Sequence, residues 1–596
     1  MKKKNPVLLC SLCIACTLSL NLSVTRAERS PYDMNARAPM AELKARPSSS
    51  HEARGYGGMV TADNALASEV GAQVLREGGD AVDAAVATAL MLGVLQPYAS
   101  GIGGGGFAVV YRPGEEPYTL DFREVGPALA HEKLYQDQRG EVIPDASTIG
   151  ALAAGVPGEV AGLYELHKRH GKLPWARLVE PALKAARDGF KMHPALFKKT
   201  KSARGWLKDH PQLGPALLDQ RGAPKAIGEQ VRFPALAWTL SELSKAGAEA
   251  FYQGPVAEEL ARAVKEAGGI ISAQDLRAYQ PKQRAPVMGS YGPYQLITMP
   301  PPSSGGAVIL QVLKAVEGAQ ISPAQHDPAQ LHQLTEALKH AFADRANLMG
   351  DPDFVHVPVQ EMLSTARIQD IKRLFNPKKT LPHDQYGGRY AATPDGGTSH
   401  FNVIDGSGAA VALTTTINTS FGSRFVAGKT GVLLNNEMDD FVSKPGVPNA
   451  FGLVGREANA IAAGKKPLSS MSPTIILEEG KVRGMIGASG GPTIITGTLQ
   501  VALTLIHTHA KRGDVAGAVV APRVHHQWTP NYILYDGGFK PETIKALEAR
   551  GHTVKPWGRF TSVQALWVYD PLKAGEAPLI IGASDPAKLG KPASVR

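Results

Sequence analysis

The amino-acid sequence predicts a large globular protein of the α+β class. Its 596 residues are 43% hydrophobic and only 20% charged, a balance that supports a sizeable buried core. Apolar residues recur at helical spacing, most continuously over 155–280 and 328–349. Shorter runs rich in Val, Phe, Tyr and Thr, such as 107–112 and 400–404, are typical of strands.

Residues 1–27 are typical of a secretory signal peptide. Lysines at positions 2–4 precede an apolar run over 7–20, and small residues lead to Ala27. This run is shorter than the roughly 18 residues that a membrane-spanning helix needs. We therefore expect a cleaved leader, no stable membrane span, and a periplasmic or secreted mature chain.

The leader contains all three cysteines of the chain. The mature chain therefore has no cysteine for a disulfide, a thiol nucleophile or a metal ligand. The leader also carries four positive charges, so the formal charge of +10 becomes only mildly positive. No run of Lys and Arg interleaved with aromatic residues suggests a nucleic-acid groove, and we expect no such partner.

After a polar lead-in, the first elements predicted are two helices and two strands. Residues 67–97 have helical spacing in two segments, divided at Gly78 and Gly79. The segments 107–112 (FAVVYR) and 117–124 (PYTLDFRE) then read as strands.

Thr398 lies at an unusual junction. Residues 376–397 lose their apolar periodicity and read as a long, flexible strap that ends in two glycines. Beyond it, 400–404 (HFNVI), a DGSG turn and 409–417 (AAVALTTTI) predict a hairpin. Thr398 therefore stands between a flexible segment and a rigid sheet.

A glycine-rich motif at 101–106 (GIGGGG) matches the dinucleotide-binding pattern GxGxxG. A dinucleotide site requires a strand before the glycines and a helix after them. Here a helical pattern comes first and a strand follows, so we expect a close-packed backbone turn and no nucleotide.

A second motif, 487–491 (GASGG), matches the GxSxG nucleophile elbow. It has a strand-like segment before it and a helical one after it, and Asp536 and His552 follow Ser489 in the order of α/β-hydrolases. No HGGG-type oxyanion segment lies upstream at a fitting place. We therefore keep a serine hydrolase as an alternative and favour a structural turn.

Histidines do not predict a metal site. The chain has 17 of them but no HExxH motif. His525 and His526 are adjacent, so on a strand they would point to opposite faces. We expect structural histidines and no metal.

A threonine hydroxyl is a weak nucleophile until a base removes its proton. The α-amino group of an N-terminal threonine suits this task, because its pKa of about 7.7 to 8 leaves much of it neutral near neutral pH. Thr398 gains such a group only if the bond to Gly397 is cut. Glycines before it leave that carbonyl accessible and permit strained backbone angles. From these residues alone, an ordinary strand threonine remains the commoner interpretation.

The segment from Thr398, TSHFNVIDGSGAAVALTTTINTSFG, resembles the start of the small subunit of γ-glutamyltranspeptidases, members of the N-terminal nucleophile hydrolase superfamily. The resemblance continues through GVLLNNEMDDF, KPGVPNAFGLVG, KPLSSMSPTII, GASGGPTIITG and APRVHHQW. It reaches back to EGGDAVDAAVA, GIGGGGF and DFRE, and so covers nearly the whole mature chain in long, ordered motifs.

The resemblance implies a four-layer αββα sandwich that is made as one precursor and cuts itself before Thr398. The products would be a large subunit, 28–397, and a small catalytic subunit, 398–596, which stay together as a heterodimer. It implies no cofactor. The activity implied is that of a γ-glutamyltransferase and glutathione hydrolase, which passes a γ-glutamyl group from glutathione or a similar compound to water, an amino acid or a peptide.

The resemblance also assigns catalytic roles. Thr398 would attack the Gly397 carbonyl during maturation and the substrate γ-carbonyl afterwards. Thr416, on the facing strand, would orient Thr398. Gly490 and Gly491 would offer backbone N–H groups to the oxyanion, where missing side chains allow close approach.

Substrate binding would use the two charges of an amino acid. Arg123 would bind the α-carboxylate as a fork with the hydroxyls of Ser469 and Ser470. Asn418, Glu437 and Asp440 would hold the α-ammonium. Without the resemblance, these residues read as a surface ion pair, a turn and a solvated acidic loop.

Phe451 departs from the family pattern. It lies in a lid segment, KPGVPNAF, where members with this lid commonly have tyrosine. Phe451 keeps the aromatic ring but lacks the hydroxyl of tyrosine. This leaves open the balance between transfer of the acyl group to an acceptor and its hydrolysis by water. Two alternatives also remain: a glutaryl or cephalosporin acylase of the same superfamily, and an unprocessed relative that acts as a binding protein.

Overall fold

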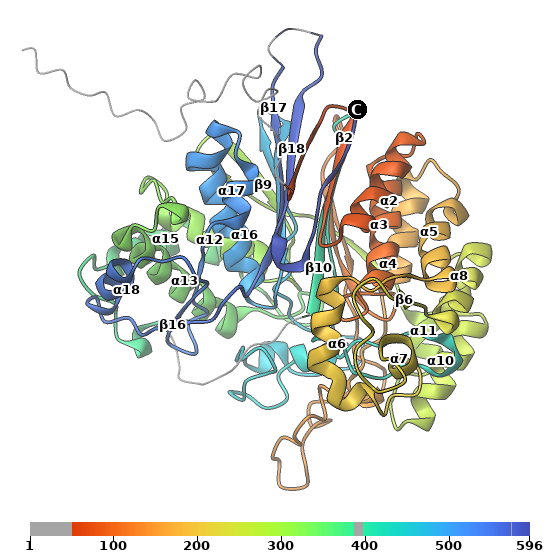
Figure 1. The fold of residues 1–596 in the computed structure, drawn as a ribbon. Coiled ribbons are helices and arrows are strands. Elements are labelled where there is room, and N and C mark those ends of the chain that lie inside the picture. Colours follow the sequence, from red (N-terminus) through yellow and green to blue (C-terminus); the bar gives the residue numbers. More distant parts are fainter. Residues whose placement is uncertain (1–49, 387–396, 572, 574) are drawn as a thin grey trace, which may run out of the picture.

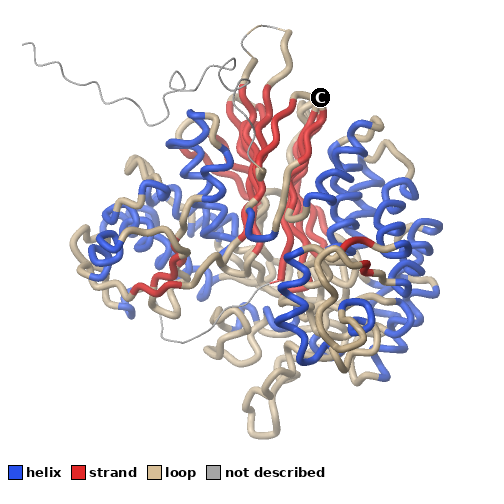
Figure 2. Tube along the Cα trace, in the orientation of Figure 1, coloured by secondary structure: helices blue, strands red, loops and turns tan. Residues whose placement is uncertain are grey.

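Two β-sheets lie face to face at the centre of the molecule, and helices cover the outer face of each (Figures 1 and 2). The computed structural model describes residues 50–386, 397–571, 573 and 575–596. The predicted signal peptide, 1–27, and residues 387–396 of the predicted strap lie outside these residues. The predicted four-layer αββα sandwich is confirmed.

The first sheet contains the hairpin that begins at Thr398. It is antiparallel throughout, in the order β19-β2-β10-β11-β3-β4-β7. Its strands are β2 (Gly58–Ala62), β3 (Gly105–Tyr111), β4 (Tyr118–Phe122), β7 (Lys282–Arg284), β10 (Gly397–Asp405), β11 (Ala410–Asn418) and β19 (Ala593–Val595). The hairpin strands β10 and β11 therefore occupy the centre of the sheet.

The second sheet is also antiparallel, in the order β1-β18-β17-β13-β12-β9-β8. Its strands are β1 (Glu52–Gly55), β8 (Val287–Tyr291), β9 (Tyr294–Thr298), β12 (Thr474–Glu478), β13 (Lys481–Ser489), β17 (Ser562–Tyr569) and β18 (Leu579–Ser584). Small sheets of β14 (Val524–His525), β15 (Ile533–Tyr535) and β16 (Val554–Pro556), and of β5 (Phe190–Lys191) and β6 (Gln230–Val231), lie outside the sandwich.

Apolar side chains from both sheets meet between them. Met59, Val109 and Ile404 of the first sheet share one buried cluster with Met485 and Leu566 of the second. Burying this area removes apolar surface from water and fixes the spacing of the sheets. As a result, β10 and β13 lie against each other across the interface.

The helices form two outer layers with separate cores (Figure 1). The layer on the first sheet contains α2 (Ala65–Arg76), α3 (Ala81–Leu95), α4 (Glu159–His170), α5 (Trp175–Asp188), α6 (Pro194–Leu207), α7 (Leu213–Leu217), α8 (Pro234–Ala246), α9 (Glu249–Tyr252), α10 (Pro255–Glu266) and α11 (Ala273–Ala278). The other contains α12 (Gly305–Val316), α13 (Pro328–Leu348), α14 (Val359–Met362), α15 (Thr365–Leu374), α16 (Thr493–Thr504), α17 (Val515–Val520) and α18 (Pro541–Glu548). No helix among the described residues is both long and apolar enough to cross a membrane.

The predicted early elements agree with the structure. The helical pattern over 67–97 forms α2 and α3, which are divided at the predicted glycines. The glycine-rich run at 101–106 is a close-packed turn: a Cβ on Gly104 would lie 1.9 Å from the carbonyl oxygen of Thr416. This contact explains the glycines without a nucleotide.

The described part of the strap, 376–386, is fastened to the protein. The Tyr386 hydroxyl donates to Glu336 on α13, and the Thr380 N–H donates to the Arg550 carbonyl, 2.8 Å away. The remaining residues up to Gly396 lie outside the described residues.

Candidate active site

Thr398 lies at a bulge in the central hairpin. The pairing of β10 with β11 slips between Gly397, which faces Asn418, and Thr398, which faces Thr416. Such a bulge changes the direction in which neighbouring side chains point. It brings both threonine hydroxyls and the Gly397 carbonyl to one place.

The Thr416 hydroxyl connects the groups that would react. Its oxygen is 2.8 Å from the Gly397 carbonyl oxygen and 3.1 Å from the Thr398 hydroxyl, and it accepts the Asn418 N–H at 2.8 Å. A hydroxyl has one proton to donate. When the Thr416 hydroxyl donates its hydrogen bond to the Gly397 carbonyl, its oxygen accepts a hydrogen bond from the Thr398 hydroxyl. Thr416 then polarises the carbonyl and orients the Thr398 hydroxyl.

Two glycines follow the end of β13 and precede α16. Gly490 has a φ of +135° and Gly491 has a φ of +60°, values that side chains disfavour. A Cβ would lie 2.6 Å from the Phe560 carbonyl oxygen at Gly490, and 2.6 Å from the Phe451 ring at Gly491. Because they lead into the N-terminus of a helix, this turn favours negative charge.

Arg123 is paired with the predicted acidic residues. It lies just after β4 and is buried, with 1% of its side chain exposed. Its guanidinium forms ion pairs with Glu437 and, at 2.5 Å, with Asp440, while its Nε donates to the Pro467 carbonyl. The structure therefore joins three predicted residues in one buried ion cluster.

The cluster has more carboxyl groups than Arg123 alone can neutralise. Burial raises the pKa of the Glu437 carboxyl well above its usual range, although Arg123 acts in the opposite direction. Burial likewise raises the pKa of Asp440 and brings that of the neighbouring Glu124 to about 7. A further cation in the cavity would favour the ionised carboxylates and offset this cost.

The two predicted serines, Ser469 and Ser470, line the same space as the ion cluster. Ser469 accepts the Met471 N–H through its hydroxyl, and its carbonyl accepts from Ser304. Among the described residues, neither the Ser470 hydroxyl nor the second carboxylate oxygen of Glu437 has a hydrogen-bond partner, although both atoms are buried. Buried polar atoms are nearly always paired, so these atoms favour a polar ligand between them.

These residues enclose a small space, which we call the inner cavity. It measures about 20 Å³ and lies between Thr398, Gly491 and the ion cluster. Asn418 also lines it, and the Asn418 amide donates to the Asn436 carbonyl at 3.0 Å. The buried ring of Phe451 covers it from the lid segment. The structure thus places nine of the ten predicted catalytic and binding residues around the inner cavity, and the tenth, Gly490, lines a second cavity.

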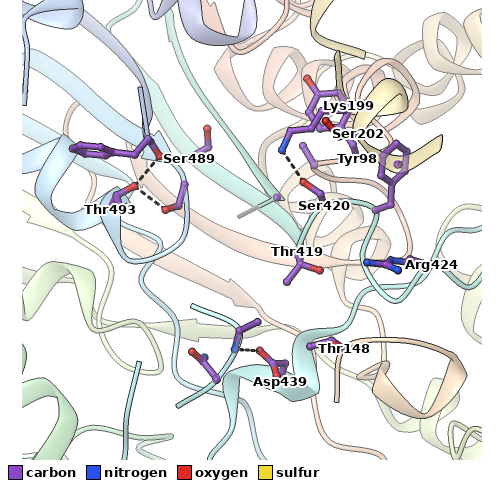
Figure 3. Close-up of a pocket in the computed structure, with 18 of the residues that line it drawn as sticks. Tyr98, Thr148, Lys199, Ser202, Thr419, Ser420, Arg424, Asp439, Ser489 and Thr493 are labelled. Atoms are coloured by element: carbon purple, nitrogen blue, oxygen red, sulfur yellow. Dashed lines mark hydrogen bonds between the residues drawn. The ribbon is translucent and has the colours of Figure 1, made fainter. Parts of the chain in front are cut away.

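On the other side of Gly397 lies a much larger space, the outer cavity (Figure 3). It measures about 870 Å³ and is lined by residues of α6, of the 419–424 turn and of the 557–562 segment. Gly397 and Gly490 line it, whereas Thr398 and Gly491 line the inner cavity. Thr398 and Gly397 therefore lie between a small charged cavity and a wide one.

Sequence reasoning missed a buried carboxylate that supports this strand. Asp63 follows β2 and is fully buried. It accepts hydrogen bonds from the His400 N–H, Ser489, Ser562, Gln564 and Lys588. Lys588 also donates to the carbonyl of Thr398. No quoted motif contains Asp63, and its donors come from four distant segments, so no local pattern predicts the contact.

The serine-hydrolase alternative finds no support in the positions of its residues. The Ser489 hydroxyl is 3.3 Å from Asp63 and 3.5 Å from the Ser562 carbonyl. Asp536 instead pairs with Arg559, and His552 bonds to His332. The three residues do not form a triad.

Three buried residues, His332, Glu336 and His552, have ligand atoms close enough to hold a metal ion. The two histidines bond directly at 2.7 Å. Glu336 is already bound by Lys339, Thr380 and Tyr386. These contacts satisfy the group as a structural network, so we assign no metal to it. His525 and His526 are buried and bonded to Thr496 and to the Trp528 N–H.

Comparisons with known proteins agree with this geometry. The family model of γ-glutamyltranspeptidase matches residues 67–595. The chain is 40% identical over 541 residues to a glutathione hydrolase proenzyme of Escherichia coli, covering 90% of this chain and 92% of the relative. It is 41% identical over 555 residues to glutathione hydrolase 2 of Arabidopsis thaliana, covering 90% and 93%.

Solved structures share the architecture. A cephalosporin acylase from Bacillus halodurans superposes with a TM-score of 0.80 at 25% identity, covering 93% of this chain and 98% of that one. A Helicobacter pylori γ-glutamyltranspeptidase chain superposes with a TM-score of 0.52 at 40% identity, covering 53% and 91%. The fold defines an enzyme of the N-terminal nucleophile hydrolase class. Within that class, the chain belongs to the γ-glutamyltranspeptidase family.

We predict that Asp63→Asn destabilises the protein and slows any cleavage before Thr398. The amide would direct N–H donors at groups that themselves donate, and it would leave Lys588 without its charge partner. We expect a loss of about 1–3 kcal/mol in the free energy of unfolding. Urea unfolding and gel analysis of fresh protein measure the two effects. Asp370→Asn, where the side chain is half-exposed, is the control, and equal behaviour of the two variants would contradict the role of Asp63.

Proposed function

We propose that this enzyme cuts itself before Thr398 and then transfers γ-glutamyl groups from glutathione or related compounds to water, an amino acid or a peptide. The observation that carries the proposal is the ion cluster of Arg123, Glu437 and Asp440 beside Thr398, with unpaired buried polar atoms in the cavity between them. Its charges complement both charged groups of a glutamyl α-carbon.

In the maturation step, the Thr398 hydroxyl oxygen attacks the Gly397 carbonyl carbon. The new C–O bond replaces the C–N bond, and the hydroxyl proton passes to the departing Thr398 nitrogen. Water then hydrolyses this ester to give a Gly397 carboxylate and a free Thr398 amine. The hydrogen bond from Thr416 to the Gly397 oxygen favours attack, because it draws electron density from the carbonyl.

In turnover, the free amine of Thr398 takes the hydroxyl proton as the oxygen attacks the γ-carbonyl of the substrate. The backbone N–H groups of Gly490 and Gly491 would stabilise the oxyanion at the helix N-terminus. The proton then passes to the leaving amine as the C–N bond breaks. Water or an acceptor amine attacks the resulting ester and regenerates Thr398.

For substrate binding, Arg123 with Ser469 and Ser470 would hold the α-carboxylate. The α-ammonium would lie against Asn418, Glu437 and Asp440. Arg123 already contacts both acidic residues, so the substrate charges would enter an existing ion network and share its partners. The Ser470 hydroxyl and the second Glu437 oxygen would gain partners at the same time.

The segment with Phe451 bears on the balance between hydrolysis and transfer. The Phe451 ring packs on Gly491, and its carbonyl accepts from Gln527 at 3.2 Å. Without a tyrosine hydroxyl, the ring holds the lid by packing alone. We therefore propose that water reaches the ester readily and that hydrolysis competes strongly with transfer.

The proposed function also includes export and assembly from two subunits. Residues 1–27 would direct export to the periplasm or medium and be removed. Large subunit 28–397 and small subunit 398–596 would remain as a heterodimer, because both sheets contain strands from both segments. No cofactor is needed for the chemistry described.

A cephalosporin or glutaryl acylase is the second candidate, favoured by the superposition on the Bacillus halodurans enzyme. A glutaryl group keeps the carboxylate at the far end of its chain but lacks the α-ammonium. It could still pair with Arg123, but it would leave Glu437 and Asp440 without the ammonium that they would bind, which disfavours this candidate.

We predict that Thr398→Ala remains a single chain, because no hydroxyl attacks Gly397. The wild type should give two fragments, the smaller beginning Thr, Ser, His, Phe. Intact mass and N-terminal sequencing measure this. Ser489→Ala is the control and should still be cleaved. A cleaved and active Thr398→Ala enzyme would overturn the proposal, and an uncut wild type would favour a binding protein.

We predict that Arg123→Lys raises KM for γ-glutamyl substrates while cleavage stays intact. Lysine keeps the charge but has no planar fork to contact two partners at once. Steady-state kinetics on a γ-glutamyl anilide, with gel analysis of cleavage, provide the measurement. Unchanged kinetics would mean that the α-carboxylate is bound elsewhere.

We predict a strong preference for a γ-glutamyl anilide over a glutaryl anilide. Sites that pair polar substrate groups can reject analogues lacking them by up to roughly 10⁴- to 10⁵-fold. Asp440→Asn should lose more activity on the γ-glutamyl substrate than on the glutaryl one. Comparable wild-type kcat/KM for both anilides would support the acylase instead.

A further inference from the structure

A further cavity, which we call the side cavity, lies in the helical layer on the first sheet. It measures about 720 Å³, a size typical of pockets that bind small molecules. Its walls come from residues 212–236, which include α7 and the start of α8, from 259–262 of α10, and from the turn 426–431. These helices lie together on the right of the molecule in Figure 1. No residue that lines the inner or the outer cavity lines this one, so the chemistry at Thr398 gives it no role.

Hydrogen bonds fix the shape of the side cavity. The turn 426–431 comes after Thr398 in the chain, whereas the other walls come before it. The Gly428 carbonyl accepts from the Gln212 side-chain amide at 2.6 Å. The Thr430 carbonyl accepts from the hydroxyl of Thr239, on α8, at 2.8 Å. The cavity is therefore formed before any ligand enters, which lowers the entropic cost of binding one.

Much of the lining is apolar. It includes Leu213, Ala216, Phe233, Leu236 and Val426. Phe233 and Leu236 are only half-buried, so part of their apolar surface remains in contact with water. Covering this surface with an apolar group is favourable, because it removes apolar area from water. A ligand that fits the side cavity therefore has an apolar body.

Positive charge accompanies these apolar residues. Four cations line the side cavity, those of Lys225, Arg232, Arg262 and Lys429, against the single carboxylate of Glu259. That carboxylate is bound by the Arg262 guanidinium and by the Lys429 N–H, each at 2.8 Å. Within the part of the chain that the structure describes, no carboxylate lies within ion-pair distance of Lys225, Arg232 or Lys429.

Backbone carbonyls hold two of these cations at the side cavity. The Lys225 ammonium donates to the Gln230 carbonyl at 3.2 Å. The Arg232 Nε donates to the Asp188 carbonyl at 3.0 Å. A carbonyl carries no net charge, so these contacts position the cations without neutralising them. Burial lowers the pKa of the Lys225 ammonium, and an anion beside it would favour its charged form.

Two carboxylates outside the lining lie near these cations, those of Asp188 and Glu229. Asp188 pairs with Arg187 at 2.8 Å, and Glu229 accepts the Ala226 N–H. Both acidic residues are exposed, so water and salt screen their charge. The side cavity therefore keeps an excess of positive charge.

We propose that the side cavity binds an aliphatic carboxylate, whose chain covers Phe233 and Leu236 and whose charged end pairs with the cations Lys225, Arg232 and Lys429. The positive charge favours an anion over a neutral ligand, and the apolar lining favours a hydrocarbon chain over an inorganic anion. The ligand would contact segments from both sides of Thr398. The proposal does not rest on the proposed function, because binding at this site needs no reaction at Thr398.

The test compares octanoate with octanamide, which has the same chain and no charge. Titration calorimetry on the purified full-length protein measures the affinity of each. We expect octanoate to bind roughly three- to tenfold more tightly, as one or two partly exposed ion pairs would give. Lys225→Gln, Arg232→Gln and Lys429→Gln should each reduce this ratio, and the triple variant should bring it close to one. Arg221→Gln is the matched control, at an exposed position that does not line the side cavity, and should keep the wild-type ratio.

A second variant tests the place of binding. Ala216→Trp puts a large side chain into the side cavity and should abolish octanoate binding, whereas Ala226→Trp, at an exposed position outside the lining, should not. Circular dichroism checks that both variants fold, and if Ala216→Trp does not, the triple variant decides alone. No octanoate binding, equal affinities for the two probes, a ratio that survives in the triple variant, or binding that survives in a folded Ala216→Trp would overturn the proposal. Calorimetry without substrate gives the same answer whether or not the γ-glutamyl activity is found.

Discussion

The arrangement around Thr398 depends on the hydrogen bonds of the Thr416 hydroxyl. It bridges the Gly397 carbonyl and the Thr398 hydroxyl, and it is itself fixed by the Asn418 N–H. This geometry exists only because the pairing of β10 with β11 slips at one position. In a regular ladder the carbonyl would take part in strand pairing, and the hydroxyl would have no short path to it.

The sandwich holds this hairpin from both faces. Pairing with β2 and β3 fixes β10 and β11 within the sheet, and packing on β13 places the Gly490 turn next to Thr398. Asp63 adds a buried ion pair with Lys588, which connects the start of β10 to the C-terminal segment. Because interiors are close-packed, a shift in either sheet would move the nucleophile relative to the glycine turn.

The two cavities beside Thr398 differ in charge. The inner cavity combines a buried arginine with several carboxyl groups, so it suits a zwitterion. The outer cavity presents Lys199 and Arg424 on one wall. Burial strengthens ionic contacts in the inner cavity, whereas water weakens such contacts at the partly exposed wall of the outer cavity.

The sequence by itself determined the helices divided at Gly78, the hairpin after Thr398 and the candidate residues within its motifs, because periodicity, turn chemistry and motif order are local properties. It also identified the close-packed turn at 101–106. Only the tertiary structure decided that Arg123 pairs with Glu437 and Asp440, that Asp63 gathers donors from four segments, and that α6 faces the outer cavity. These contacts join residues hundreds of positions apart. Their distances are set by how the two sheets pack, and no local pattern in the chain records that packing.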